Sequence, residues 1–143
     1  MKFPILTICL VATCLSAAQG QVMQKKDKIE ESWGAPTKRM DSDFPVTKQC
    51  GYKKDGWGLA VSYMNDSAIK VIYVKTDNSA ITAAQIEKIL AANRKTGTWV
   101  VTDRSKEGTT YKNEKDHIEA VISGSILILT NSTIASFERG ELK

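Results

Sequence analysis

Residues 57–63 read Trp-Gly-Leu-Ala-Val-Ser-Tyr, so large apolar side chains alternate with small ones. This period of two predicts a β-strand with one buried face. The side chains on that face are Trp57, Leu59, Val61 and Tyr63. The short turn sequences 54–56 (Lys-Asp-Gly) and 65–67 (Asn-Asp-Ser) flank the strand. Strands joined by such short turns pair antiparallel, so the segment predicts an antiparallel meander.

Further strands are expected on both sides of this one. Residues 46–53 form the preceding strand, with Cys50 and Tyr52 on one face, and the following strand carries Ile69, Val71 and Tyr73. Four more strand-like segments follow in the second half of the chain. These are residues 98–103, 109–112, 117–122 and 125–130. Residues 126–129 are continuously apolar, which predicts a central strand covered on both sides.

One helix is expected before the strands and a better marked one between them. Residues 22–33 have helical spacing, and Gly34 and Pro36 end the helix. Thr82 and Gln85 have the spacing of a capping box at the start of the second helix. Its apolar stripe consists of Ala83, Ile86, Leu90 and Asn93, widened by Ile89. Gly97 is expected to close this helix.

The expected order of elements is α-βββ-α-ββββ, with residues 131–137 as a possible short closing helix. The predicted fold class is therefore α+β, with antiparallel β-meanders packed against one or two helices. No interior repeat stands out in the sequence.

The first 20 residues have the three parts of a secretory signal peptide. Lys2 is the positive start, residues 3–12 are apolar apart from Thr7, and residues 16–20 are mostly small. The apolar run is far shorter than the ~20 residues of a membrane-spanning helix. We therefore expect cleavage after Ala18 or Gly20, and export to the periplasm or the medium.

Cys14 offers a second interpretation of the leader. Residues 11–14 (Val-Ala-Thr-Cys) resemble the lipobox of bacterial lipoproteins, although Thr13 stands where that motif has a smaller residue. Lipidation of Cys14 would anchor the protein to the envelope by more than one acyl chain. Without it, no membrane contact is expected.

Residues 21–143 are long enough for one small domain. The whole chain has a net charge of +4, and Lys2 is the one charged residue of the leader. The basic pairs of the domain stand at the ends of expected elements without interleaved aromatic residues, so a nucleic-acid partner is not expected. The expected partner is a protein.

The residues that could carry chemistry are few. The chain has one histidine, His117, and Cys50 is the one cysteine outside the leader. A thiol–imidazole pair defines the alternative function, a small hydrolase or thiol enzyme. Because neither residue lies in a catalytic motif, we expect no enzyme and no cofactor. There are too few ligands for a zinc site, so no metal is expected.

The aromatic residues are numerous for a small domain, and most fit the core. Tyr52 and Trp57 are the candidates for an exposed aromatic docking surface, because aromatic anchors dominate protein interfaces.

Residues 29–36 (Ile-Glu-Glu-Ser-Trp-Gly-Ala-Pro) resemble the helix end that opens the small bacterial envelope domains of the SmpA/OmlA type. The similarity extends through the strand segments 49–52, 59–63 and 68–71, and so covers residues 29–74. These domains share a fold with β-lactamase-inhibitor proteins, but they usually have two helices where this chain has one. The second half of the chain is similar to small exported bacterial proteins without an assigned activity. The resemblance implies a non-enzymatic envelope or secreted binding module.

Overall fold

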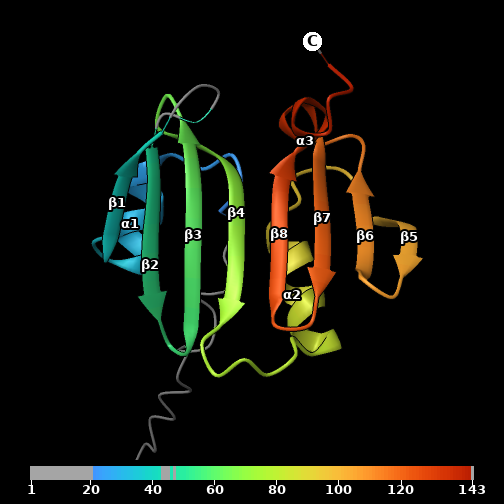
Figure 1. Cartoon of the computed structure of the whole chain (residues 1–143), viewed down its shortest axis with the longest axis horizontal. Coiled ribbons are helices and arrows are strands. Elements are labelled where there is room, and N and C mark those ends of the chain that lie inside the picture. The colour runs from blue at the N-terminus through green and yellow to red at the C-terminus, as the bar shows by residue number, and fades with distance from the viewer. Residues whose placement is uncertain (1–20, 43–45, 47, 143) are drawn as a thin grey trace, which may run out of the picture.

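The computed structural model describes residues 21–42, 46 and 48–142, and these residues form one antiparallel sheet with three helices (Figure 1). The predicted α+β class is therefore confirmed. The predicted leader and Cys14 lie outside the described residues.

The elements come in two consecutive sets with the same order. The first set is α1 (Lys26–Trp33), β1 (Lys38–Asp41), β2 (Lys48–Lys54), β3 (Trp57–Met64) and β4 (Ser67–Lys75). The second set is α2 (Ala83–Ala92), β5 (Val100–Ser105), β6 (Gly108–Asn113), β7 (Ile118–Ser123) and β8 (Ile126–Asn131). A third helix, α3 (Ser132–Glu138), follows β8 directly.

The two sets meet through their last strands. The order across the sheet is β1-β2-β3-β4-β8-β7-β6-β5, and β4 pairs antiparallel with β8. One helix followed by a four-stranded meander thus occurs twice, with the copies facing each other across the β4–β8 seam. The sequence shows no such repeat because the shared architecture depends on burial pattern and turn spacing, which different residues satisfy.

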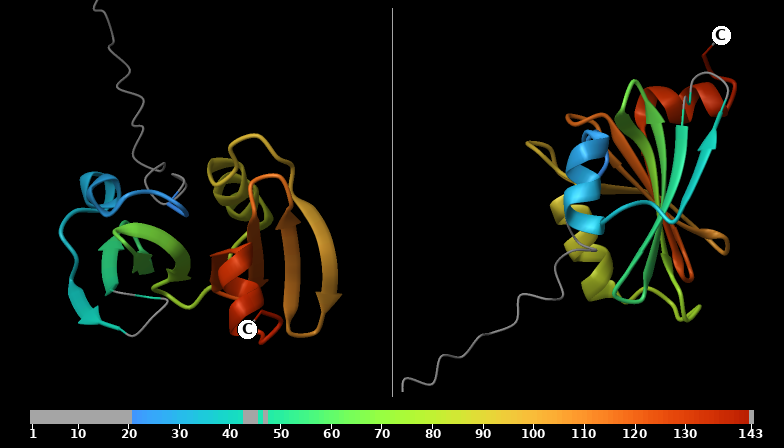
Figure 2. Two further views of the ribbon diagram at one scale, coloured as in Figure 1. Left: turned by 90° about the horizontal axis from the view of Figure 1, so that it is seen from above. Right: turned by 90° about the vertical axis from the view of Figure 1, so that its left-hand side faces the viewer.

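Helices α1 and α2 cover one face of the sheet, whereas α3 lies on the other face at one end of the strands (Figure 2). The predicted inward face of β3 is confirmed, since Leu59, Val61 and Tyr63 are buried and Trp57 is half-buried. The Tyr73 ring lies beneath the first helix. It makes edge-to-face contacts with the rings of Trp33 and Trp57, with centroid distances of 6.4 Å and 6.3 Å.

Helix α2 begins as predicted. The Thr82 hydroxyl accepts from the Gln85 backbone N–H at 3.2 Å, and the Gln85 side chain accepts from the Thr82 N–H at 3.0 Å. The predicted buried stripe needs correction, because Ala83 is exposed and Ile86 is half-buried. The centre of the buried face lies one turn later, at Ile89, Leu90 and Asn93.

Two helix boundaries lie several residues away from their predicted positions. Helix α1 begins at Lys26, not Val22, because residues 21–25 run alongside the start of β4: Met23 N–H donates to Ala68 O at 2.6 Å and Ala68 N–H to Gln24 O at 2.9 Å. Helix α2 ends at Ala92, so Gly97 does not close it. Gly97 is instead packed against Asn113, whose Oδ1 would lie 1.8 Å from an added Cβ.

Strand β1 was not predicted. Its four residues are all exposed, so no alternation of buried and exposed side chains marks it. Its Lys-Arg-Met-Asp sequence forms an edge of the sheet, where charged side chains discourage pairing with another chain.

Candidate functional site

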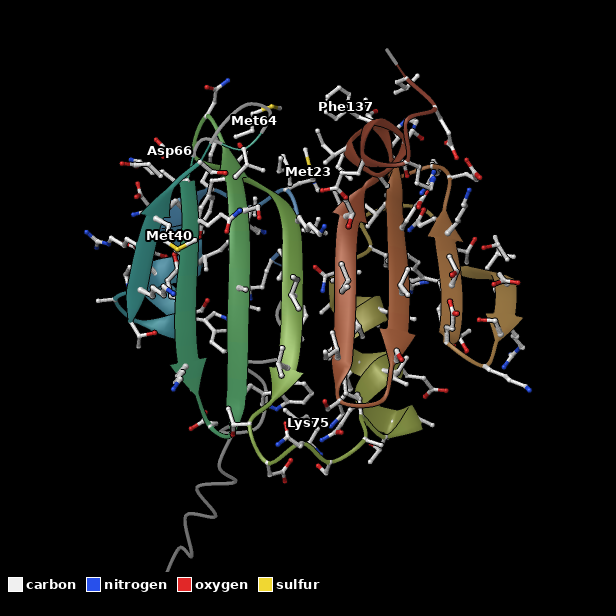
Figure 3. The ribbon with its side chains drawn as sticks, viewed as in Figure 1. Met23, Met40, Met64, Asp66, Lys75 and Phe137 are labelled. Atoms are coloured by element: carbon white, nitrogen blue, oxygen red, sulfur yellow. The ribbon has the colours of Figure 1, made fainter. Side chains whose placement is uncertain are left out.

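Among the described residues, the sheet face opposite α1 and α2 has no covering layer apart from α3 at one end of the strands. We call it the open face; Figures 1 and 3 look onto it. Its residues alternate along each strand with the buried residues of the helix-covered face. On β4, for example, Ile72 and Val74 belong to the open face because Val71 and Tyr73 are buried on the other.

Aliphatic side chains gather in the middle of the open face, on the two strands of the seam and their neighbours. Strand register places Ala60, Ile72, Ile128 and Val121 in one row across β3, β4, β8 and β7. Val74 and Ile126 pair in the adjacent row. We call these six residues the aliphatic patch. Val121 and Ile126 are each 39% exposed, so the patch is accessible to a partner.

The sequence prediction for β8 needs correction at this point. Strand β8 is central, as residues 126–129 indicated, but it is not covered on both sides. Leu127 and Leu129 are fully buried beneath α2, whereas Ile126 and Ile128 face outward. The continuous apolar run therefore reflects the β8 part of the patch, Ile126 and Ile128, and not a second covering layer.

Helix α3 closes one end of the open face through ion pairs. Glu138 pairs with Lys70 of β4 at 3.2 Å. Arg139, just after the helix, donates two hydrogen bonds to the nearly buried Glu119 of β7, at 2.7 and 3.2 Å. Hydrogen bonds to Glu141 and Glu119 raise the pKa of the Arg139 guanidinium further. In Figure 3, Phe137 of α3 stands at the same end of the sheet as Met64.

The flank of the open face on β1 and β2 is basic. Lys38, Met40 and Lys53 are exposed there, and Lys38 lies opposite Gly51 in the register of the two strands. Strands β2 and β3 carry further small residues beside the patch, namely Gly51, Gly58 and Ser62. These small side chains project little from the sheet between the basic flank and the aliphatic patch. A partner can therefore approach this part of the open face with little steric obstruction.

Tyr52 and Trp57 do not form the predicted docking surface. Tyr52 is 1% exposed, and its hydroxyl shares a 2.8 Å hydrogen bond with that of Tyr63. Burial raises the pKa of the Tyr52 hydroxyl, so the pair stays neutral. Trp57 is half-buried against the core. The reason is strand parity: Tyr52 lies opposite Leu59, and both face the helices.

The two residues of the alternative function, Cys50 and His117, lie in different halves of the sheet. Cys50 is a buried free thiol in β2, whereas His117 is exposed in the turn before β7. Three strands separate β2 from β7, which is on the order of 20 Å at the usual strand spacing. The structure therefore does not bring the thiol and the imidazole together.

Within residues 21–42, 46 and 48–142, no group of histidine, cysteine, aspartate and glutamate side chains has the arrangement of a metal site. In the same part of the chain, none of the helices combines the length and the hydrophobicity needed to span a membrane.

Comparison with known proteins gives a likeness of fold. No protein-family model and no curated protein matches the sequence. The structure is similar to a cysteine-rich secretory protein from Staphylococcus aureus subsp. aureus Mu50, with a TM-score of 0.53 and 15% sequence identity. The match covers 82% of this chain and 47% of that one, so this chain spans about half the length of its structural neighbour. At this identity the likeness concerns the fold alone.

Proposed function

We propose that the chain is an exported, non-enzymatic binding domain that docks a protein partner on its open face. The observation that carries this proposal is the accessible aliphatic patch on an uncovered sheet face. An exposed apolar area of this kind costs free energy in water, and in soluble proteins such areas often serve as interaction sites. The fold shared with a secretory protein, and the signal-like leader, support export.

The partner we propose is a protein with an apolar docking surface that is acidic on one side. The patch would bury the apolar part, and Lys38 and Lys53 on the β1–β2 flank would face the acidic part. Lys70 and Lys112 are already paired with Glu138 and Glu119, whereas Lys38 and Lys53 make no salt bridge with any residue that the structure describes. Complementary charge of this kind speeds association and fixes the orientation of the partner.

The resemblance of residues 29–74 to SmpA/OmlA-type domains belongs to the same proposal, since it implies a binding module of the envelope. Whether the protein is released or held by a lipidated Cys14 changes where the partner is met. The face that meets it stays the same.

Photo-crosslinking in the native cell tests the proposal. A photoreactive amino acid replaces Val121 in the patch or, as the matched control, Ala84, which is exposed on α2 on the opposite face. We expect one protein to be crosslinked from position 121 and not from position 84, with less product when the salt concentration is raised. Crosslinking from position 84 alone, or equally from both positions, would contradict docking on the open face.

A further inference from the structure

The methionines of the described residues lie around the open face, not in the core. Met23 and Met40 are 40% and 46% exposed, and Met64 is half-buried. Met1, in the predicted leader, is the other methionine of the chain. Methionine is among the residue types most often buried in proteins, yet none of the described core residues is a methionine. The thioethers that the structure describes are therefore at the surface, where an oxidant can reach them.

Met40 belongs to the basic flank of the open face. Its neighbour Arg39 lies opposite the buried Cys50 and so faces the helices, which turns the Met40 side chain to the open face. In Figure 3, Met40 lies over β1 and β2, whereas Met64 and Met23 lie at the end of the sheet that carries α3. The three side chains thus border the open face on two of its sides.

A partner centred on the aliphatic patch would reach all three methionines. Met40 on β1 is three strand spacings from Ile72 on β4, about 14 Å. Met64 lies four residues beyond the residue that pairs with Ile72 in β3, and the Met23 N–H donates to Ala68 O, four residues before Ile72. Both offsets are about 13 Å along a strand. A standard interface covers about 800 Å² on each partner, a circle of about 16 Å radius.

We infer that Met23, Met40 and Met64 are sites of reversible oxidation, and that their sulfoxides weaken docking on the open face. The inference rests on the proposed function of that face. The oxidant is a peroxide: the thioether sulfur attacks one peroxide oxygen, an S–O bond forms as the O–O bond breaks, and the second oxygen leaves as water after a proton transfer. The sulfur loses two electrons, and the peroxide gains them.

Oxidation at these positions changes the surface and spares the core. A sulfoxide is polar, so its burial against an apolar partner costs hydration that a thioether does not have. The sulfur of Cys50 is shielded from the same oxidant, because the residue is 3% exposed. The fold therefore stays intact while the apolar area offered to the partner becomes smaller.

Titration of the protein crosslinked from position 121 tests the inference. The exported chain is treated with dilute hydrogen peroxide, separated from it, and mapped by peptide mass spectrometry to locate the added oxygen atoms. The matched control is the triple variant Met23→Leu, Met40→Leu and Met64→Leu, which keeps apolar side chains but has no thioether at these positions. We expect oxidised wild type to bind at least tenfold more weakly, and methionine sulfoxide reductases to restore the affinity. The peroxide-treated variant should bind like the untreated one.

Oxidised wild type that binds as tightly as before would overturn the inference and leave docking on the open face intact. An equal loss of affinity in wild type and variant would place the sensitive group elsewhere, and would overturn it too. Urea unfolding gives a readout without the partner: we expect oxidation to leave the midpoint unchanged, and a lower midpoint would show damage to the core instead of a change of surface. If untreated wild type crosslinked no protein, the proposed function would fail, and this inference with it.

Discussion

The carboxylate of Asp116 shows how one side chain can hold a loop of this fold in place. It accepts hydrogen bonds from the backbone N–H groups of Lys95, Thr96 and Gly97, at 2.7 to 3.2 Å, and from the Asn113 side chain at 2.9 Å. Desolvation raises the pKa of Asp116, but these hydrogen bonds outweigh it and hold the pKa well below its usual value. The turn after β6 is thereby tied to the loop after α2.

The stability supplied by Asp116 is expected to depend on pH. Because its pKa is lower in the folded than in the unfolded state, the unfolded state binds more protons in acid. The contribution is therefore complete above about pH 4, the ordinary pKa of aspartate, and is lost as the pH falls further. We expect Asp116→Asn to lower the denaturant midpoint at pH 7 and the difference from wild type to shrink toward pH 2. Asp103→Asn, at an exposed position on β5, is the control and should change little.

Gly97 is required by its neighbour, not by its backbone angles. An added Cβ would lie 1.8 Å from Asn113 Oδ1, and Asn113 is fully buried. We expect Gly97→Ala to destabilise the protein by about 1–3 kcal/mol, since the core must shift to accept one more carbon. Gly58→Ala is the matched control: its nearest atom is Val74 O at 3.8 Å, an ordinary contact, so the change should be within about 0.5 kcal/mol. Equal costs, measured by denaturant unfolding, would show that packing at Gly97 is not limiting.

At the scale of elements, the sequence predicted those with local signals. The capping box of α2 and the alternation of β3 are signals of this kind, and both are confirmed. Strand β1 carries no signal because all of its side chains are exposed. The sequence of a strand also does not indicate what covers its faces. Residues 126–129 would be equally apolar whether a second layer of this protein or a partner covered Ile126 and Ile128. The candidate site was missed for that reason.

Helix α2 provides a ranking of substitutions that tests its packing. Ile89 is 2% exposed, so Ile89→Ala should cost about 2–5 kcal/mol. Ile86 is half-buried, and Ile86→Ala should cost less. Thr82→Ala should cost about 1 kcal/mol through loss of the cap, and Lys88→Ala, at an exposed position, should cost almost nothing. Denaturant midpoints on the purified domain give the order. A Lys88→Ala variant as unstable as Ile89→Ala would mean that the helix face is wrongly assigned.

At the scale of the whole molecule, two helix-and-meander units share one continuous sheet. Both helices cover the same face, which leaves the β4–β8 seam in the middle of a long open face. The seam brings Ile72 and Val74 of the first unit beside Ile128 and Ile126 of the second. The aliphatic patch therefore exists only when both units are joined, and neither half of the sequence could reveal it alone.

The central claim is that this patch binds a protein partner, and the affinity of that partner tests it most directly. The partner crosslinked from position 121 is purified and titrated with wild type, Val121→Asp and Ala84→Asp. Both changes place an acid at an exposed position, one in the patch and one on α2. We predict that Val121→Asp weakens binding at least tenfold, about 1.4 kcal/mol, while Ala84→Asp binds like wild type. Equal affinity of all three proteins, with unchanged stability, would contradict the claim.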